Sequence, residues 1–459
     1  MPYLGNSLSI QQYAPTITYF NGNGSTTAFT LPIPVASAAQ VIVHVENVPQ
    51  NPATAFTISG STLTFTSAPP TGSNNIWVEY TALQTNTIAP SQGTVQNSSF
   101  GSITSIPFVN GGPIGGGNSS LLKNRIINGA MVIDQRNAGA SVTPATSPTT
   151  FDCDRWSFIV TQASKLTAQQ STTAPTGFNY SQLITSSSAY SVTATDVFEL
   201  KQLIEGYNVA DLGWGTANAK TVTLSFQVYS SLTGTFGGAL QNSAYNRSYP
   251  FSYSIPVANT WTTISITIPG DTTGTWLTTN GVGIRVVFGL GVGSTYSGTA
   301  GSWAGTEYHS ATGATSVVGT SGATFYITGV QLEVGTSATG FEYRQYQQEL
   351  ALCQRYYVRY TVVGPAFWGF TAGQVSASTA AYFGYNNFLR ATPTVTYNNL
   401  YINDTSTNSA VTSVSVPSAS NTPSIQFGAS GGGLTAGRSA LLYCATSAGG
   451  SYFDLSAEL

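Results

Sequence analysis

Charged residues are scarce in this chain of 459 residues: they make up 7% of it, compared with roughly 25% in an average soluble protein. The first 122 residues contain no Lys or Arg, and their only acidic residues are Glu46 and Glu79. Binding to nucleic acid or to an anionic membrane requires clustered cations. This composition and the net charge of −3 therefore argue against both kinds of partner.

Cysteine, histidine and long apolar runs are equally rare. Cys153, Cys353 and Cys444 are far apart and odd in number, so no disulfide framework is predicted. His44 and His309 have no neighbours that would complete a zinc site or a triad, and we predict surface or rim positions for both. The chain lacks a signal-peptide pattern and any apolar run long enough to cross a bilayer. We therefore expect synthesis in a reducing cytoplasm, no membrane insertion, and neither metal nor cofactor.

Apolar residues are nevertheless plentiful, with 41% hydrophobic and 12% aromatic residues. A chain of this length holds about three domains of ordinary size. Its dominant pattern is the alternation of apolar and polar residues, which is typical of half-buried strands. The sequence predicts an all-β protein of tandem β-sandwich or jelly-roll domains with one short helix.

The first predicted domain covers residues 1–83, where short strands are separated by turn dipeptides such as Asn21-Gly22 and Ser59-Gly60. Strands this short and this closely spaced favour a small β-sandwich or a partly open barrel. Residues 84–122 are rich in Ser, Thr, Asn and Gly, and we interpret them as a linker or neck.

The second predicted domain covers residues 123–357. Its candidate strands are 155–160, 196–204, 221–229, 261–268, 284–288 and 324–333. The run Gly289-Leu-Gly-Val-Gly-Ser follows a strand, but no helical pattern or phosphate-binding Lys comes after it. We interpret it as a flexible connection and not as a dinucleotide loop.

One helix is predicted over residues 343–357, because Tyr346, Leu350, Cys353 and Tyr357 recur at helical spacing. Cys353 lies on this stripe and is predicted to be buried. The helix either packs around the axis of a trimer or caps the sandwich of its own chain. Residues 358–459 return to strands and form the third predicted domain.

Motifs in the same order resemble those of bacteriophage tail-fibre proteins. They are residues 19–31, Asn124-Arg-Ile-Ile-Asn-Gly-Ala-Met, Gly329-Val-Gln-Leu-Glu-Val-Gly and Leu389-Arg-Ala-Thr-Pro-Thr-Val. The resemblance implies an N-terminal module that attaches to the virion, a carbohydrate-binding-like β-sandwich, and a terminal domain that contacts the host. It also implies a homotrimer located in the tail fibre, made in the host cytoplasm and acting outside the cell.

This resemblance implies partners at both ends of the chain. The N-terminal module is expected to bind tail components such as an adaptor or nozzle, and the distal domains to bind a glycan or protein of the host surface. The residues expected to serve virion attachment are Tyr19, Phe20, Phe29, Leu31, Phe65, Trp77 and Tyr80. A head fibre or another virion appendage, and a glycan-degrading tailspike, remain as alternatives.

Aromatic residues among polar ones are the candidate ligand contacts, because Trp and Tyr rings stack on sugars while amides and hydroxyls satisfy sugar hydroxyls. Two groups have this character, and packing in a β-core is the alternative for each member. The groups are Trp303, Tyr308 and His309 in a loop, and Trp368, Tyr382, Tyr385 and Phe388 in the terminal domain.

Asp134, Asp152 and Asp154 are the candidate catalytic or metal-binding carboxylates. A pair of them on one strand face would suit glycoside hydrolysis, and several together would suit calcium. Arg155 follows Asp154 directly, and the spacing matches no calcium loop. We therefore favour a structural ion pair and turn, and predict a protein that is not an enzyme.

Overall fold

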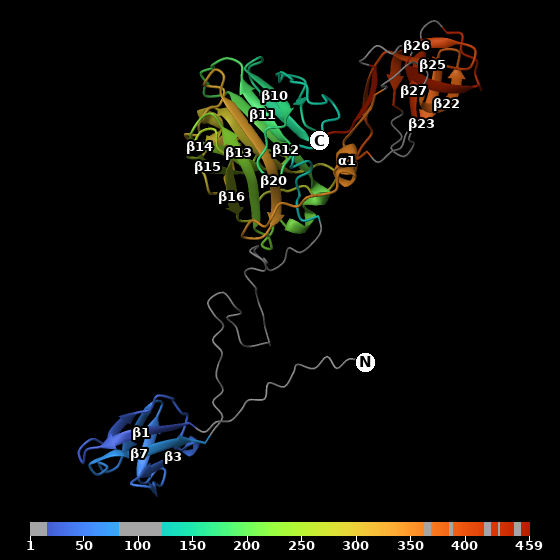
Figure 1. Cartoon of the computed structure of the whole chain (residues 1–459). Coiled ribbons are helices and arrows are strands. Elements are labelled where there is room, and N and C mark those ends of the chain that lie inside the picture. The colour runs from blue at the N-terminus through green and yellow to red at the C-terminus, as the bar shows by residue number, and fades with distance from the viewer. Residues whose placement is uncertain are drawn as a thin grey trace, which may run out of the picture. The chain divides into compact units, whose positions relative to one another are not determined.

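The computed structural model describes residues 16–81, 122–361, 369–384, 389–416, 424–429, 432–444 and 451–459. Nearly all of its elements are strands, and the described residues contain one α-helix (Figure 1). The chain divides into two compact units, Met1–Ser98 and Ser99–Leu459. No helix in the described ranges is long and apolar enough to cross a membrane.

The N-terminal unit contains two small antiparallel sheets. The first has the order β1 (Ile17–Gly22), β7 (Gly72–Tyr80), β3 (Val41–Val45) and β4 (Val48–Pro49). The second has the order β2 (Ala28–Thr30), β6 (Thr62–Phe65) and β5 (Phe56–Ser59). A 3₁₀ turn, η1 (Ala38–Gln40), precedes β3. Alternate residues of the strands, such as Val43, Ile76 and Val78, are buried in one common core, as the alternating pattern predicts.

The second unit contains a large sandwich of two antiparallel sheets. The five-stranded sheet has the order β10 (Leu166–Ser171), β11 (Ser181–Ser186), β20 (Thr324–Val334), β13 (Val222–Ser230) and β16 (Thr262–Ile268). The six-stranded sheet has the order β15 (Ser248–Ile255), β14 (Gly234–Gln241), β17 (Val282–Val292), β12 (Val197–Glu205), β9 (Trp156–Val160) and β8 (Thr150–Phe151).

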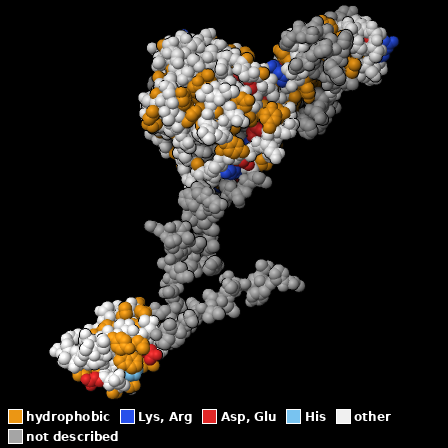
Figure 2. All heavy atoms as spheres, viewed as in Figure 1, with side chains coloured by type: hydrophobic (Ala, Val, Ile, Leu, Met, Phe, Trp, Pro, Cys, Tyr) orange, Lys and Arg blue, Asp and Glu red, His pale blue; other side chains and the backbone are white. Residues whose placement is uncertain are grey.

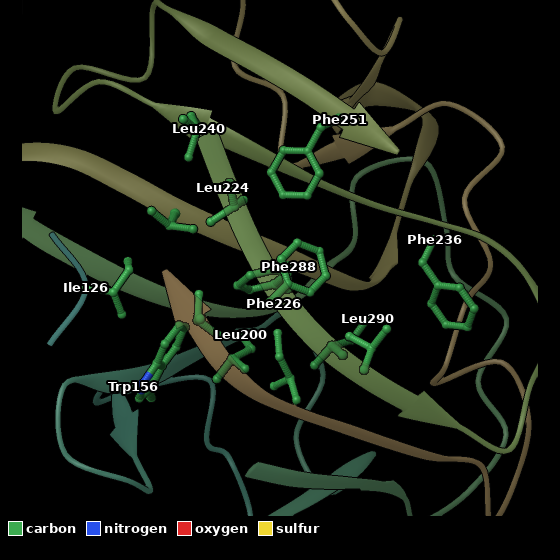
Figure 3. Packing of buried hydrophobic residues seen from close by; sticks show 14 of the residues in the cluster. Ile126, Trp156, Leu200, Leu224, Phe226, Phe236, Leu240, Phe251, Phe288 and Leu290 are labelled. Carbon is green, nitrogen blue, oxygen red and sulfur yellow. The ribbon is translucent and has the colours of Figure 1, made fainter. Parts of the chain in front are cut away.

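Large aromatic side chains from both sheets fill the space between them (Figure 3). Phe226 of β13 and Phe288 of β17 meet with ring centroids 5.0 Å apart, and Trp156 of β9 packs on Phe288 at 6.2 Å. Each fully buried aromatic ring removes about 150–250 Å² from water, so rings of this kind dominate the stability of the sandwich.

Two predictions within this sandwich were wrong or incomplete. The glycine run from Gly289 lies largely inside strand β17 and not in a flexible connection. Gly291 allows the covering loop to approach, since a Cβ there would lie 2.4 Å from Val318 Cγ1. The candidate strands also omitted β10, β11, β14 and β15. Strand β15 contains Pro250, which is tolerated since β15 is the edge strand of its sheet.

The helix α1 spans Tyr346–Gln354 and is shorter than predicted at both ends. At its C-terminal end, strand β21 (Tyr357–Thr361) follows after two residues. Cys353 is buried as predicted, in a cluster with Ile127, Ile133 and Tyr356 of the same chain. Tyr346 is exposed, so the predicted apolar stripe was wrong at that position.

The last part of the chain forms a three-stranded sheet and a closed barrel. The sheet has the order β21, β29 (Tyr452–Ser456) and β24 (Thr394–Asn398). The barrel runs β22 (Gly369–Ala377), β23 (Ala380–Gly384), β27 (Ser424–Ala429), β26 (Asn408–Ser415), β25 (Leu400–Asn403) and β28 (Ser439–Cys444).

Several of the few charged residues form ion pairs where this sheet meets the sandwich. Glu458, just beyond β29, is bound by Arg136 at 2.9 Å and by the buried Arg155. Arg359 of β21 makes a two-pronged ion pair with Asp454 at 2.8 and 2.6 Å. These ion pairs connect segments that are distant in sequence.

Candidate functional site

A pocket of about 210 Å³ lies where the segment after β20 passes the connection between β10 and β11. We call it the aromatic pocket. Its lining residues are Ala130, Val132, Gly177, Phe178, Asn179, Phe341, Tyr343, Arg344, Tyr346 and Glu349.

Three aromatic rings form one wall of the aromatic pocket. The ring centroids of Phe178, Phe341 and Tyr343 lie 5.0–5.4 Å from one another. Gly329 of β20 makes room for this wall, since it has a φ of +63° and a Cβ there would lie 2.7 Å from the Phe178 ring. The Tyr343 hydroxyl donates to Gly177 O at 2.7 Å, which fixes the ring direction.

The aromatic surface is also accessible. Tyr343 is 60% exposed and Tyr346, at the start of α1, is 63% exposed. Exposed aromatic rings lose apolar contact that a core position would provide, so a pair of them beside a pocket indicates a surface that is covered on binding. The Asn179 side chain, also exposed, supplies an amide at the same rim.

The polar floor of the aromatic pocket is built by Arg344 and Glu349, which are both buried. Arg344 Nη1 donates to Ile126 O at 3.0 Å and approaches Glu349 Oε1 at 3.3 Å. Its buried Nε has no hydrogen-bond partner. An unpaired buried donor costs about 1–3 kcal/mol.

The predicted loop group lies elsewhere, against the six-stranded sheet, and is largely occupied with internal contacts. Trp303 packs on Trp214 and Trp276, with centroids 5.3 and 5.5 Å away, and its Nε1 donates to Pro269 O. The Tyr308 carbonyl accepts a hydrogen bond from Gln241. Trp303 and Tyr308 are half-buried.

His309 is only 3% exposed, so the prediction of a surface or rim position was wrong. Its Nδ1 lies 2.5 Å from Glu199 and its Nε2 lies 2.9 Å from Glu307. Burial disfavours the charged imidazole, but the two carboxylates outweigh it and raise the pKa of His309 above its usual value. Sequence reasoning did not connect Glu199 with His309, because the two residues are more than a hundred positions apart in the chain.

A wider polar cluster surrounds this histidine. The Arg285 guanidinium lies 4.1 Å above the Tyr245 ring, whose other neighbour is His309 at 6.0 Å. Lys201, 6% exposed, lies on the same sheet face, and burial lowers its pKa although Glu199 opposes this. These contacts hold the loop with His309 against the sheet.

The predicted terminal group is only partly described. Tyr382 lies on β23 and is exposed. Trp368, Tyr385 and Phe388 lie outside the described residues.

Of the candidate carboxylates, Asp152 and Asp154 lie in the turn between β8 and β9 and not on one strand, and both are fully buried, whereas Asp134 precedes β8. Burial raises the pKa of Asp154 to about 6, against the opposing effect of Arg136, whose guanidinium is 3.3 Å away. Asp134 accepts hydrogen bonds from the backbone N–H groups of Asn137 and Gly139. Asp154 therefore lies in a turn and in an ion pair, but its partner is Arg136 and not the adjacent Arg155, which pairs with Glu458. The described part of the chain contains no cluster of His, Cys, Asp or Glu suited to a metal.

The residues expected to serve virion attachment separate into two sets. Tyr19 and Trp77 lie on the outer face of the four-stranded sheet, and Tyr19 is exposed. The others pack in or against the core of the N-terminal unit: Phe20, Phe29, Leu31, Phe65 and Tyr80.

No protein-family model and no curated protein matches the chain. Solved structures with local similarity include the enzymatically active domain of bacteriophage CBA120 tailspike protein 4, at 12% identity and a TM-score of 0.23, which covers 46% of this chain and 22% of that chain. A putative sugar binding protein from Bacteroides thetaiotaomicron is similar at 14% identity and a TM-score of 0.28, over 46% of this chain and 100% of that chain. A family 11 carbohydrate-binding module from Clostridium thermocellum is similar at 10% identity and a TM-score of 0.23, over 44% and 98%.

The chain spans about a fifth of the length of the tailspike domain that it matches. At TM-scores this low, none of these similarities decides what the chain binds. The β-sandwich follows from the two sheets themselves and from the core that they share.

Proposed function

We propose that this chain is a non-enzymatic tail-fibre subunit of a bacteriophage, attached to the virion through its N-terminal unit and binding a host surface glycan through its distal unit. The observation that carries the binding part is the aromatic pocket, which combines two exposed tyrosines with the exposed amide of Asn179.

Sugar recognition suits this combination of groups. The C–H face of a pyranose stacks on Tyr343 or Tyr346, while the exposed amide of Asn179 hydrogen-bonds to hydroxyl or ring oxygens. The pocket is smaller than the roughly 300–1,000 Å³ of drug-sized sites, so its occupant is about the size of one sugar residue.

Weak single contacts are compatible with firm attachment. A shallow sugar contact has a dissociation constant of about 1 mM, and several copies in one assembly raise the apparent affinity by roughly 10²–10⁴. A homotrimer, which the resemblance to tail fibres implies, would provide such copies. Trp368, Tyr382, Tyr385 and Phe388 in the terminal domain remain candidates for a second contact.

A glycan array with the full chain tests the binding part. On any glycan that binds, Tyr343→Ala should weaken affinity by roughly tenfold or more, about 1.4 kcal/mol, because it removes the stacking surface. Tyr207→Ala is the matched control, since Tyr207 is equally exposed in the 3₁₀ turn η2 (Gly206–Asn208), away from the pocket. Equal binding by wild type and Tyr343→Ala, with both folded, would reject the pocket as the glycan site.

The alternatives differ in measurable ways. A head fibre or other appendage would be found on a different part of the particle when the chain is located by immunogold labelling. A glycan-degrading tailspike would release products from host capsule. The carboxylates that such an enzyme would use, Asp152 and Asp154, are buried. Asp152 accepts a hydrogen bond from Gln182 and Asp154 forms an ion pair with Arg136, so we infer that the chain binds glycan without cleaving it.

A further inference from the structure

The outer face of the four-stranded sheet in the N-terminal unit presents apolar side chains to solvent. Residues on this face alternate with core residues along β1, β7 and β3. We call it the outer sheet face, and its members are Ile17, Tyr19, Ile42, His44, Trp77 and Glu79. In Figure 2, hydrophobic side chains gather on the visible side of this unit next to acidic ones.

The strand register aligns these side chains in two rows. Tyr19 and His44 lie on either side of Trp77, and Ile17 and Ile42 lie on either side of Glu79. Tyr19 is 54% exposed, Ile17 42% and Ile42 41%. Neighbouring large apolar side chains on one sheet face indicate an interaction surface, unlike single exposed ones.

Two rings of the aromatic row are stacked parallel to one another. The rings of His44 and Trp77 are stacked with centroids 3.6 Å apart and an interplanar angle of 8°. His44 Nδ1 is buried and has no hydrogen-bond partner. The stack therefore offers an ordered ring surface to a partner without further loss of side-chain freedom on binding.

Charge decides which kind of partner fits this face. The first 122 residues contain no Lys or Arg, so the carboxylate of Glu79 between two isoleucines has no cation of its own unit opposite it. If a second copy of this unit docked on the face, Glu79 would be desolvated without a Lys or Arg on either side, and His44 is covered by the Trp77 ring. A different protein that carries a cation avoids this cost.

We propose that the outer sheet face is a docking surface for a different protein of the particle, which presents an apolar patch around one Lys or Arg that pairs with Glu79. The inference rests on the proposed attachment of the N-terminal unit to a virion and specifies the surface and the chemistry of the partner.

The test uses phage particles that lack this chain, complemented with tagged full-length variants, and counts incorporated copies by quantitative immunoblot. Glu79→Lys should lower incorporation at least tenfold, and Ile42→Thr, which keeps a β-branched residue on the strand, should lower it severalfold. Glu46→Lys is the matched control, because it makes the same charge change in the same unit, at the turn after β3 and outside the two rows of the outer sheet face. It should be incorporated like wild type.

A charge exchange completes the test. Replacing the partner cation, located by cross-linking, with Glu should restore incorporation of Glu79→Lys. Normal incorporation of folded Glu79→Lys and Ile42→Thr would overturn the inference while leaving attachment intact. Absence of wild-type chain from every particle would instead refute the proposed function. A change of oligomeric state in Glu79→Lys, measured by analytical ultracentrifugation, would identify a second copy as the occupant and also overturn the inference.

Discussion

The burial of the Asp152 side chain predicts how the free energy of unfolding depends on pH. It is completely buried between β8 and β9, and its Oδ2 accepts a hydrogen bond from Gln182 Nε2. Asp152 Oδ1 and Gln182 Oε1 are both buried acceptors without a partner. A proton on the carboxyl supplies the donor that these oxygens lack, because a carboxylic acid and a carboxamide pair through two hydrogen bonds.

Burial accordingly raises the pKa of Asp152 to about 7, with the Gln182 hydrogen bond opposing and the Asp134 charge adding to the rise. The same carboxyl titrates near 3.9 in the unfolded chain, so the folded state binds the extra proton between about pH 4 and pH 7. Its contribution to stability is complete below pH 4 and is lost as the pH rises through 7. A difference of about three pKa units corresponds to about 4 kcal/mol.

Asp152→Asn replaces the acid by an amide, which pairs with Gln182 at every pH. The free energy of unfolding of the variant minus that of wild type should therefore grow from near zero at pH 4 to about 4 kcal/mol at pH 8. Taking this difference removes the contributions of Asp154 and His309, whose pKa values are also raised and which remain in both proteins. Urea titrations followed by tryptophan fluorescence at pH 4.5, 6 and 8 measure it. A difference that stays constant across these pH values would refute the reasoning.

Further predictions concern the junction and the packing of the sandwich. Glu458→Gln leaves the buried Arg155 without its counter-ion, so hydrogen exchange of β29 amides should accelerate roughly 10²- to 10⁴-fold, equivalent to about 3–5 kcal/mol. Asp211→Asn, at a pair whose carboxylate is 46% exposed, should change exchange less than about fivefold. Gly238→Ala should destabilise the sandwich by about 1–3 kcal/mol or more, since its Cβ would lie 2.2 Å from Val287 O, whereas Gly305→Ala meets open space and should be neutral in thermal denaturation. Equal melting temperatures for these two glycine variants would contradict the packing argument.

The sequence alone determined the fold class and many of the strands. Alternation of apolar and polar residues is a local property of a strand, so β9, β12, β13, β16 and β20 follow from residue types that are neighbours in the chain. The same local pattern predicts which face of each strand enters the core, as the buried Val43, Ile76 and Val78 show. The burial of Cys353 was predicted from another local pattern, the helical spacing of apolar residues around it.

Only the tertiary structure decided which outward faces are covered and which remain exposed. Whether Gly289 and Gly291 lie in a loop or a strand depends on Ser310 and Val318, which lie against them from the covering loop. The aromatic pocket was missed because Phe178 and Tyr343 are separated by more than 160 residues and neither belongs to a motif.

The positions of Tyr19 and His309 show why the sequence alone did not predict which outward faces are covered. Tyr19 was a candidate from the resemblance to tail fibres and His309 from its residue type, and the structure shows Tyr19 exposed and His309 buried between Glu199 and Glu307. Periodicity tells which side of its own strand a residue occupies. What lies above that side depends on chain segments distant in sequence, and these meet only when the long-range contacts of the folded protein form.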